Sequence, residues 1–174
     1  DLRMSRGLGD VYKRQVWFRK NISWITECTY SDPYYSNVEH MVYKADSNNL
    51  KLFGVNWGWA EISSRTTDDY VYDITFHFSY LDYDHYKKYN TGVHDRKQAE
   101  CDLAYKTMYE KLVDAYGEPT EVYEENDWAK YSCLWEDTND GDIFAWDSKD
   151  ENGNGEAGLS FTVADFDFST RISR

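Results

Sequence analysis

One segment of the chain, residues 95–119, carries both a start signal and a stop signal for an amphipathic helix. Asp95 is a suitable N-cap, and Gln98 three residues later completes a capping-box pattern. Gly117 and Pro119 follow the last periodic residue, where glycine can turn left-handed and proline stops the helix. Apolar side chains recur between these signals at helical spacing, at Cys101, Ala104, Tyr105, Met108, Leu112, Ala115 and Tyr116. Such a stripe must be buried, most simply against a sheet.

Alternating segments on both sides of this helix are expected to be strands. Before it we expect a short strand at the start of residues 16–30, a strand from Leu50, and a hairpin joining that strand through residues 63–69 to residues 74–80. Residues 34–46 have weakly helical spacing, and residues 121–127 are expected to form an acidic loop. After the helix we expect strands at residues 130–135, 143–147 and 158–164. This order predicts an α+β domain, an antiparallel β-sheet with one long amphipathic helix packed on one face.

The first fifteen residues resemble a translated DNA adapter. Residues 10–15 read Asp-Val-Tyr-Lys-Arg-Gln, the translation of GAT GTG TAT AAG AGA CAG, an end sequence that a transposase adds in DNA library preparation. Residues 5–9 match the preceding part of the same adapter. We therefore interpret residues 1–15 as an adapter-derived artefact and residues 16–174 as a single α+β domain. On this interpretation the native N-terminus is missing, and the sequence leaves open an export signal or a lipoprotein anchor.

The negative net charge of the chain disfavours polyanionic partners such as nucleic acids and anionic membranes. The net charge is −13, and the first fifteen residues contribute +2, which leaves −15 on residues 16–174. So acidic a surface repels nucleic acid phosphates and anionic lipid.

No apolar run approaches the length of a membrane span. Three cysteines without CxxC spacing disfavour a zinc site, and buried free thiols are the plainer interpretation.

The helix end and the segment after it resemble a group of uncharacterised gut bacterial proteins. The resemblance consists of Tyr116-Gly117-Glu118-Pro119 after an amphipathic helix, a tryptophan at Trp128 and then a hairpin. Those proteins often open with Phe-Arg-Asn-Ile-Pro-Trp-Gly, and residues 18–24 here read Phe-Arg-Lys-Asn-Ile-Ser-Trp. The arrangement is also similar to that of small outer-membrane assembly lipoproteins, at the level of the fold. These motifs are structural, so neither resemblance implies a catalytic residue.

A turn near the C-terminal end carries the strongest chemical pattern. Asp150, Asn152 and Asn154, followed by Gly155, match the first half of a calcium loop, in which alternate residues point oxygens at one centre. The second half does not match, because the twelfth position is Phe161 where a bidentate carboxylate is needed. An Asn-Gly pair is also a strong hairpin signal. We favour the hairpin turn and keep calcium as an alternative.

Other candidate residues carry weaker signals. Trp57 and Trp59 share one strand parity and could form an aromatic platform for a sugar or a peptide, but packing against the helix is the favoured interpretation. His77 falls on the polar parity of its strand and is expected to be exposed or at an edge. Residues 82, 84 and 85 are Asp, Asp and His, and a solvated loop explains them.

The sequence favours a non-catalytic binding or structural module of a bacterial protein, with the cell surface as one setting and a glycan or protein as ligand. The first alternative is a carboxylate-dependent hydrolase, because 32 acidic residues include many pairs, although none stands in a recognisable frame. The second alternative is a calcium-stabilised domain.

Overall fold

One helix and antiparallel strands make up the described part of the chain in the computed structural model, which describes residues 24–31, 38–45, 50–65, 70–80, 95–126 and 129–162. The elements are β1 (Trp24–Ser31), β2 (Val38–Ala45), β3 (Lys51–Leu52), β4 (Val55–Asn56), β5 (Trp59–Arg65), β6 (Tyr70–His77), β7 (Arg96–Lys97), α3 (Gln98–Tyr116), β8 (Glu121–Tyr123), β9 (Ala129–Thr138), β10 (Gly141–Lys149) and β11 (Asn154–Thr162). The segment that we assign to an adapter lies outside the described residues.

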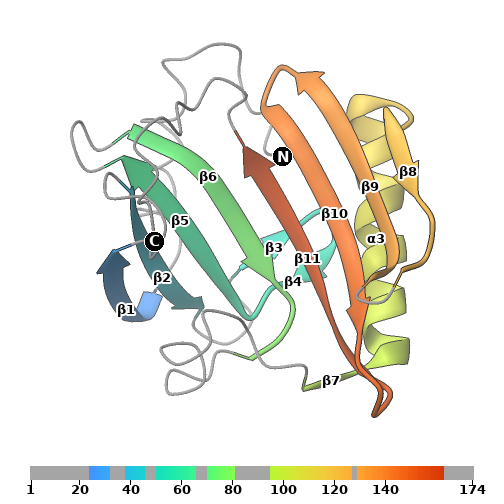
Figure 1. Cartoon of the computed structure of the whole chain (residues 1–174), viewed down its shortest axis with the longest axis horizontal. Coiled ribbons are helices and arrows are strands. Elements are labelled where there is room, and N and C mark those ends of the chain that lie inside the picture. The colour runs from blue at the N-terminus through green and yellow to red at the C-terminus, as the bar shows by residue number, and fades with distance from the viewer. Residues whose placement is uncertain are drawn as a thin grey trace, which may run out of the picture.

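The main sheet joins the two halves of the chain. Its strand order is β1-β2-β5-β6-β11-β10-β9-β8, with β7 added to one end of β11, and every pair is antiparallel. Strands β6 and β7 both come before the helix, and both pair with β11, which comes after it. Figure 1 shows this sheet as one curved layer, with α3 behind β8 and β9. The α+β fold that the sequence predicts is confirmed.

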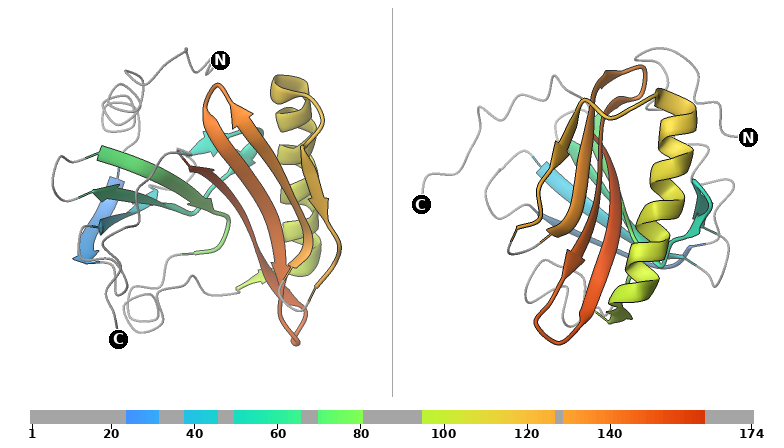
Figure 2. Two further views of the ribbon diagram at one scale, coloured as in Figure 1. Left: turned by 45° about the horizontal axis from the view of Figure 1, so that its top comes forward. Right: turned by 90° about the vertical axis from the view of Figure 1, so that its right-hand side faces the viewer.

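The helix covers one face of the sheet together with the small β3–β4 hairpin (Figure 2). Its buried residues are Cys101, Ala104, Met108 and Leu112, which recur at helical spacing. They pack into one core cluster with sheet residues that include Ile143, Ala145 and Leu159, and with Trp57 beside the hairpin. Burial of this stripe is the main favourable contribution to docking of the helix. The buried stripe therefore confirms the predicted packing, except that Ala115 is exposed.

The two ends of the helix differ in how well the sequence predicted them. Gly117 ends the helix with φ of 85° and donates its backbone N–H to the Val113 carbonyl at 2.9 Å, as expected. The predicted start is wrong, because the helix begins at Gln98 and its N-cap is Lys97. The carboxylate of Asp95 instead accepts the backbone N–H of Tyr80. Asp95 thus connects the helix entrance to the segment that follows β6.

Residues 50–59 form a hairpin and then a strand, so the prediction of one continuous strand is wrong. Phe53 and Gly54 both have positive φ, 47° and 80°, and they turn the chain between β3 and β4. Trp57 follows this hairpin, and β5 begins only at Trp59. Pairing of β5 with β6 confirms the hairpin that was predicted before the helix, but β5 continues to Arg65, into the predicted turn, and β6 begins already at Tyr70.

Two further segments differ from their predictions. Residues 38–45 form strand β2 between β1 and β5, where the spacing indicated a weak helix. Residues 121–123 form strand β8 on β9, where an acidic loop was expected. The strands predicted after the helix are confirmed as β9, β10 and β11, each longer than expected.

Candidate functional site

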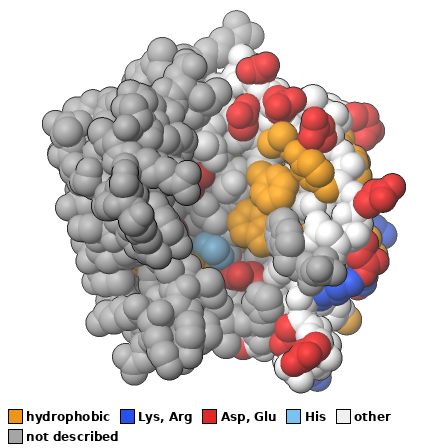
Figure 3. All heavy atoms as spheres, viewed as in Figure 1, with side chains coloured by type: hydrophobic (Ala, Val, Ile, Leu, Met, Phe, Trp, Pro, Cys, Tyr) orange, Lys and Arg blue, Asp and Glu red, His pale blue; other side chains and the backbone are white. Residues whose placement is uncertain are grey.

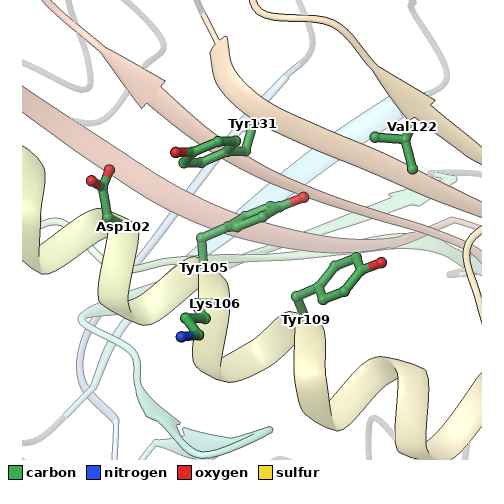
Figure 4. Close-up of a pocket in the computed structure, with 6 residues that line it drawn as sticks. All are labelled: Asp102, Tyr105, Lys106, Tyr109, Val122 and Tyr131. Carbon is green, nitrogen blue, oxygen red and sulfur yellow. The ribbon is translucent and has the colours of Figure 1, made fainter.

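A pocket of about 400 Å³ lies between α3 and the β8–β9 end of the sheet. Figure 4 shows the residues that line it, which are Asp102, Tyr105, Lys106, Tyr109, Val122 and Tyr131. The first four follow one another on α3 at spacings of three, one and three residues, so they share a helix face beside the buried stripe. Val122 comes from β8 and Tyr131 from β9, on the sheet face that carries the helix. The pocket is thus built by helical periodicity on one side and by strand alternation on the other.

Three tyrosine rings form one wall of the pocket. Tyr105 lies in the middle, with its ring centroid 5.5 Å from that of Tyr131 and 6.1 Å from that of Tyr109, and the planes are within 23° and 27° of parallel. Figure 4 shows the Tyr105 ring between the other two. The side chain of Tyr131 keeps much of its surface in solvent, since this residue is 44% exposed. The wall therefore presents aromatic surface to a ligand.

Hydrogen bonds fix two of these rings. The hydroxyl of Tyr105 donates to Cys133 Sγ at 3.2 Å, and the hydroxyl of Tyr109 donates to Glu118 Oε2 at 3.3 Å. Burial raises the pKa of the Tyr105 hydroxyl above its ordinary value, and the nearby Cys133 thiol adds to this shift. Tyr105 therefore stays neutral and keeps its donor at physiological pH.

Asp102 is the one acid among the six lining residues, and it is held in an ion pair. Lys130 Nζ lies 2.6 Å from Asp102 Oδ2, and Gln98 Nε2 donates to Asp102 Oδ1 at 3.1 Å. Burial opposes ionisation, but the hydrogen bonds from Lys130 and Gln98 lower the pKa of Asp102 below its ordinary value. Lys130 Nζ also lies 5.1 Å from the ring centroid of Tyr131. The polar end of the pocket is therefore close to electrically neutral.

A second carboxyl group lies behind Asp102 and does not line the pocket. Asp147 of β10 is 0% exposed, and its Oδ1 accepts Gln98 Nε2 at 2.8 Å. Burial, and then the neighbouring carboxyl of Asp102, raise the pKa of Asp147 to about 7. Asp147 Oδ2 and Gln98 Oε1 are buried without a hydrogen-bond partner in the structure. The two carboxyls therefore have opposite shifts although one amide bridges them.

The two tryptophans that were candidates for an aromatic platform are both buried, but the favoured interpretation, packing against the helix, is right for Trp57 and wrong for Trp59. Trp57 is 3% exposed, donates to the Leu52 carbonyl at 3.2 Å and contacts Phe76. Trp59 is 0% exposed and donates its Nε1 hydrogen to Ser79 Oγ at 3.1 Å. Only Trp57 belongs to the core cluster under the helix, and neither residue lines the pocket.

Asp150 and Asn152 lie in the turn between β10 and β11, and Asn154 is the first residue of β11, so the favoured hairpin is present. Asp150 Oδ1 accepts the backbone N–H groups of Asn152 at 2.9 Å and Asn154 at 2.8 Å, and Gly153 has φ of 80°. Among the described residues, no group of three or more His, Cys, Asp or Glu side chains could hold a metal ion. Calcium binding by Asp150, Asn152 and Asn154 stays a prediction. The Asp82, Asp84 and His85 cluster lies outside the described residues.

The opposite sheet face carries an aromatic row that the sequence did not indicate. The rings of Phe144 and Trp146 stack at 5.6 Å, and Tyr123 meets Phe144 edge-on. Figure 3 shows hydrophobic side chains gathered on this face, with acidic side chains around them. His77 was expected to be exposed or at an edge, but it is half-buried and its Nδ1 lies 2.8 Å from Glu156 Oε1.

The apolar pattern predicted Tyr105 in the buried stripe of the helix, but nothing in the sequence indicated the pocket. Tyr131 and Lys130 lie in a predicted strand, and a pair of adjacent polar and aromatic residues gives no signal of a site. Their relation to Asp102 depends on how β9 lies against α3, because 28 residues separate Lys130 from Asp102. Helical spacing of Asp102, Tyr105 and Tyr109 was the one usable signal.

Comparison of the chain with family models, with curated proteins and with solved structures gives no match. Of the helices in the described residues, none combines the length and the apolar character that crossing a membrane requires. The geometry of the pocket is therefore the main indication of function.

Proposed function

We propose that this domain is a non-catalytic binding module and that the pocket lined by Tyr105, Tyr109 and Tyr131 holds a glycan. The observation that carries the proposal is the wall of three tyrosine rings beside a polar end. The volume of about 400 Å³ falls in the range of about 300–1,000 Å³ that is typical of small-molecule sites. Aromatic faces pack against the C–H groups of a sugar ring, and hydroxyl and carboxylate groups bond to sugar hydroxyls.

The charges around the pocket favour a neutral ligand. Asp102 is paired with Lys130, so its charge is balanced before a ligand arrives. Lys106 lines the pocket but extends away from the tyrosine rings in Figure 4. An anion would meet the carboxylate of Asp102, and a cation would compete with Lys130 for it. A neutral, hydroxyl-rich ligand can accept from Lys130 or donate to Asp102 without breaking the pair.

The same arrangement supports binding over hydrolysis. A carboxylate-dependent glycosidase needs two carboxyl groups that both reach the substrate, one of them protonated. Asp102 is the one acid on the pocket wall, and its pKa is lowered. Asp147 has the raised pKa of an acid, but it is fully buried. Hydrolysis remains the alternative function, and a place at the bacterial cell surface stays a prediction from the sequence.

Calorimetric titration with soluble gluco-, xylo-, manno- and N-acetylglucosamine oligosaccharides tests the proposal. We expect at least one of them to bind, and we expect Tyr131→Ala to weaken that binding roughly tenfold or more. Tyr123→Ala is the matched control, because Tyr123 is 39% exposed on the neighbouring strand and contacts Phe144 on the opposite sheet face. This control should bind as the unchanged protein does.

Three results would contradict the proposal. The first is that no oligosaccharide in the set binds. The second is that Tyr131→Ala and Tyr123→Ala weaken binding equally. The third is that the protein cleaves the oligosaccharide that binds, which chromatography of the titrated sample would show, and this result would favour the hydrolase alternative.

A further inference from the structure

The amide group of Gln98 bridges two carboxyl groups that come from different elements. Its Nε2 donates to Asp147 Oδ1 at 2.8 Å and to Asp102 Oδ1 at 3.1 Å. Gln98 is the first residue of α3 and Asp102 lies one turn later, whereas Asp147 belongs to β10. The bridge therefore places a fully buried carboxyl directly behind the one carboxyl of the pocket wall.

The hydrogen bonds distribute charge unequally between the two acids. Asp102 Oδ2 has Lys130 Nζ at 2.6 Å, so the negative charge is stabilised there. Asp147 Oδ2 is buried and accepts no hydrogen bond. An ionised carboxylate with a bare buried oxygen is costly, and protonation of that oxygen removes the buried charge. The geometry therefore favours an ionised Asp102 beside a neutral Asp147.

We propose that Asp102 and Asp147 share one proton, carried by Asp147, and that loss of this proton weakens binding of the glycan in the tyrosine-lined pocket. The second half rests on the proposed function. Asp147 then acts as a positioning residue, because it is linked to Asp102 through Gln98 and does not line the pocket. When both carboxyls are ionised they repel each other and compete for Gln98 and Lys130, so Asp102 loses its fixed orientation.

Ionisable side chains from α3 and β9 lie around Asp147. The ionisable side chains that face it are Cys101, Asp102 and Tyr105 from α3, and Lys130 and Tyr131 from β9. On β11 its cross-strand neighbour is Ala157. Burial raises the pKa of Cys101 to about 12, and burial also raises the pKa of Tyr105. The hydrogen bond to Asp102 raises the pKa of Lys130. Asp147, with a pKa of about 7, is thus the group that responds to pH in this cluster.

The first arm of the test needs no ligand. Carboxyl carbon signals of the full chain are followed by NMR from about pH 3 to about pH 9. We expect Asp147 to titrate near neutrality, and the Asp102 signal to show a second, smaller step at the same midpoint because the two sites are coupled. Asp147→Asn should remove that second step. Titration of Asp147 at or below the ordinary value for an aspartate would overturn the shared proton.

The second arm measures affinity for the oligosaccharide that binds best, at about pH 6 and about pH 8.5. Between these two pH values we expect the affinity of the unchanged protein to fall roughly fivefold or more, which is a usual size for coupling between sites. The affinity of Asp147→Asn should fall by less than about half over the same range. Asp114→Asn is the matched control, because Asp114 is an exposed aspartate on the same helix. This control should keep the pH dependence of the unchanged protein.

The two arms separate the two ideas. Equal pH dependence in the unchanged protein and in Asp147→Asn would overturn the coupling between the shared proton and the pocket. A normal carboxyl titration in the first arm would overturn the proton itself, whatever binds. If Asp147 titrates near neutrality but no oligosaccharide binds, the shared proton is supported, and both the proposed function and its coupling to that proton are overturned.

Discussion

The imidazole ring of His77 lies flat on the indole ring of Trp59, with ring centroids 3.6 Å apart and planes 4° apart. A closed set of polar contacts supports this stack. Trp59 Nε1 donates to Ser79 Oγ at 3.1 Å, Ser79 Oγ donates to Glu156 Oε1 at 2.6 Å, and His77 Nδ1 lies 2.8 Å from the same oxygen. Buried Trp59 of β5 is therefore connected by these contacts to His77 of β6 and to Glu156 of β11.

We expect Ser79→Ala to destabilise the fold by about 1–3 kcal/mol. The substitution leaves the buried Nε1 hydrogen of Trp59 without its acceptor and removes one donor from Glu156. Unfolding in urea, followed by tryptophan fluorescence, measures the change. Ser160→Ala, on the same sheet face and half-buried, is the control and should change stability by less than about 0.5 kcal/mol. Equal losses of stability in Ser79→Ala and Ser160→Ala would show that the hydrogen bonds of the Ser79 hydroxyl do not stabilise the fold.

We expect Gly158→Ala to destabilise the fold by about 2 kcal/mol or more. Gly158 lies opposite Trp146 in the register of β10 and β11, and a Cβ at this position would overlap the Trp146 ring. The same urea experiment measures the effect, and the fluorescence of Trp146 should shift as its ring is displaced. A stability equal to that of the unchanged protein would show that the ring does not cover Gly158.

Asp147 should make the stability of the protein fall as pH rises. Its folded pKa of about 7 is above the ordinary aspartate value, so the folded state holds a proton that the unfolded state has lost. The favourable contribution is complete below about pH 4 and is lost as pH rises to about 7, at up to roughly 1.4 kcal/mol per pH unit. Asp147→Asn should remove this slope. Parallel stability curves for the two proteins in urea would contradict the prediction.

Asp150 should stabilise the β10–β11 turn through its carboxylate oxygen. Asp150→Ala removes the acceptor of two backbone N–H groups and should cost about 1 kcal/mol, whereas Asp150→Asn keeps a side-chain oxygen and should cost less. Thermal unfolding measures both variants. Addition of calcium should leave the melting temperature of the unchanged protein constant. A rise that Asp150→Ala abolishes would instead establish the calcium-stabilised alternative.

The sequence predicted the elements whose pattern is local. Cys101, Met108 and Leu112 recur at helical spacing, and Gly117 ends the helix, because these signals depend on neighbours along the chain. The predicted start was misplaced, because Asp95 bonds to Tyr80, fifteen residues earlier in the chain, and not to the first turn of the helix. Side-chain capping competes with tertiary contacts that a sequence does not show.

The strand at residues 38–45 and the pocket could not be predicted for a related reason. Val38, Met41 and Val42 recur as in a helix, but two neighbouring strands fix this segment as the strand between them. The pocket depends on the placement of Tyr131 and Lys130 beside Asp102, which is set by the packing of β9 against α3. The buried position of Asp147 beside Asp102 could not be predicted either, because it depends on the hydrogen bond from Gln98, which belongs to the helix and is distant in sequence.

NMR shift mapping shows directly whether the tyrosine-lined pocket is the ligand site. The oligosaccharide that binds best is added to the full chain, and amide and aromatic signals are followed. We predict that shifts concentrate on Tyr105, Tyr109, Tyr131 and Asp102, with little change at Phe144 and Trp146. Shifts that concentrate on Phe144, Trp146 and Tyr123 would place the ligand on the opposite sheet face, and the tyrosine-lined pocket would then not be the ligand site.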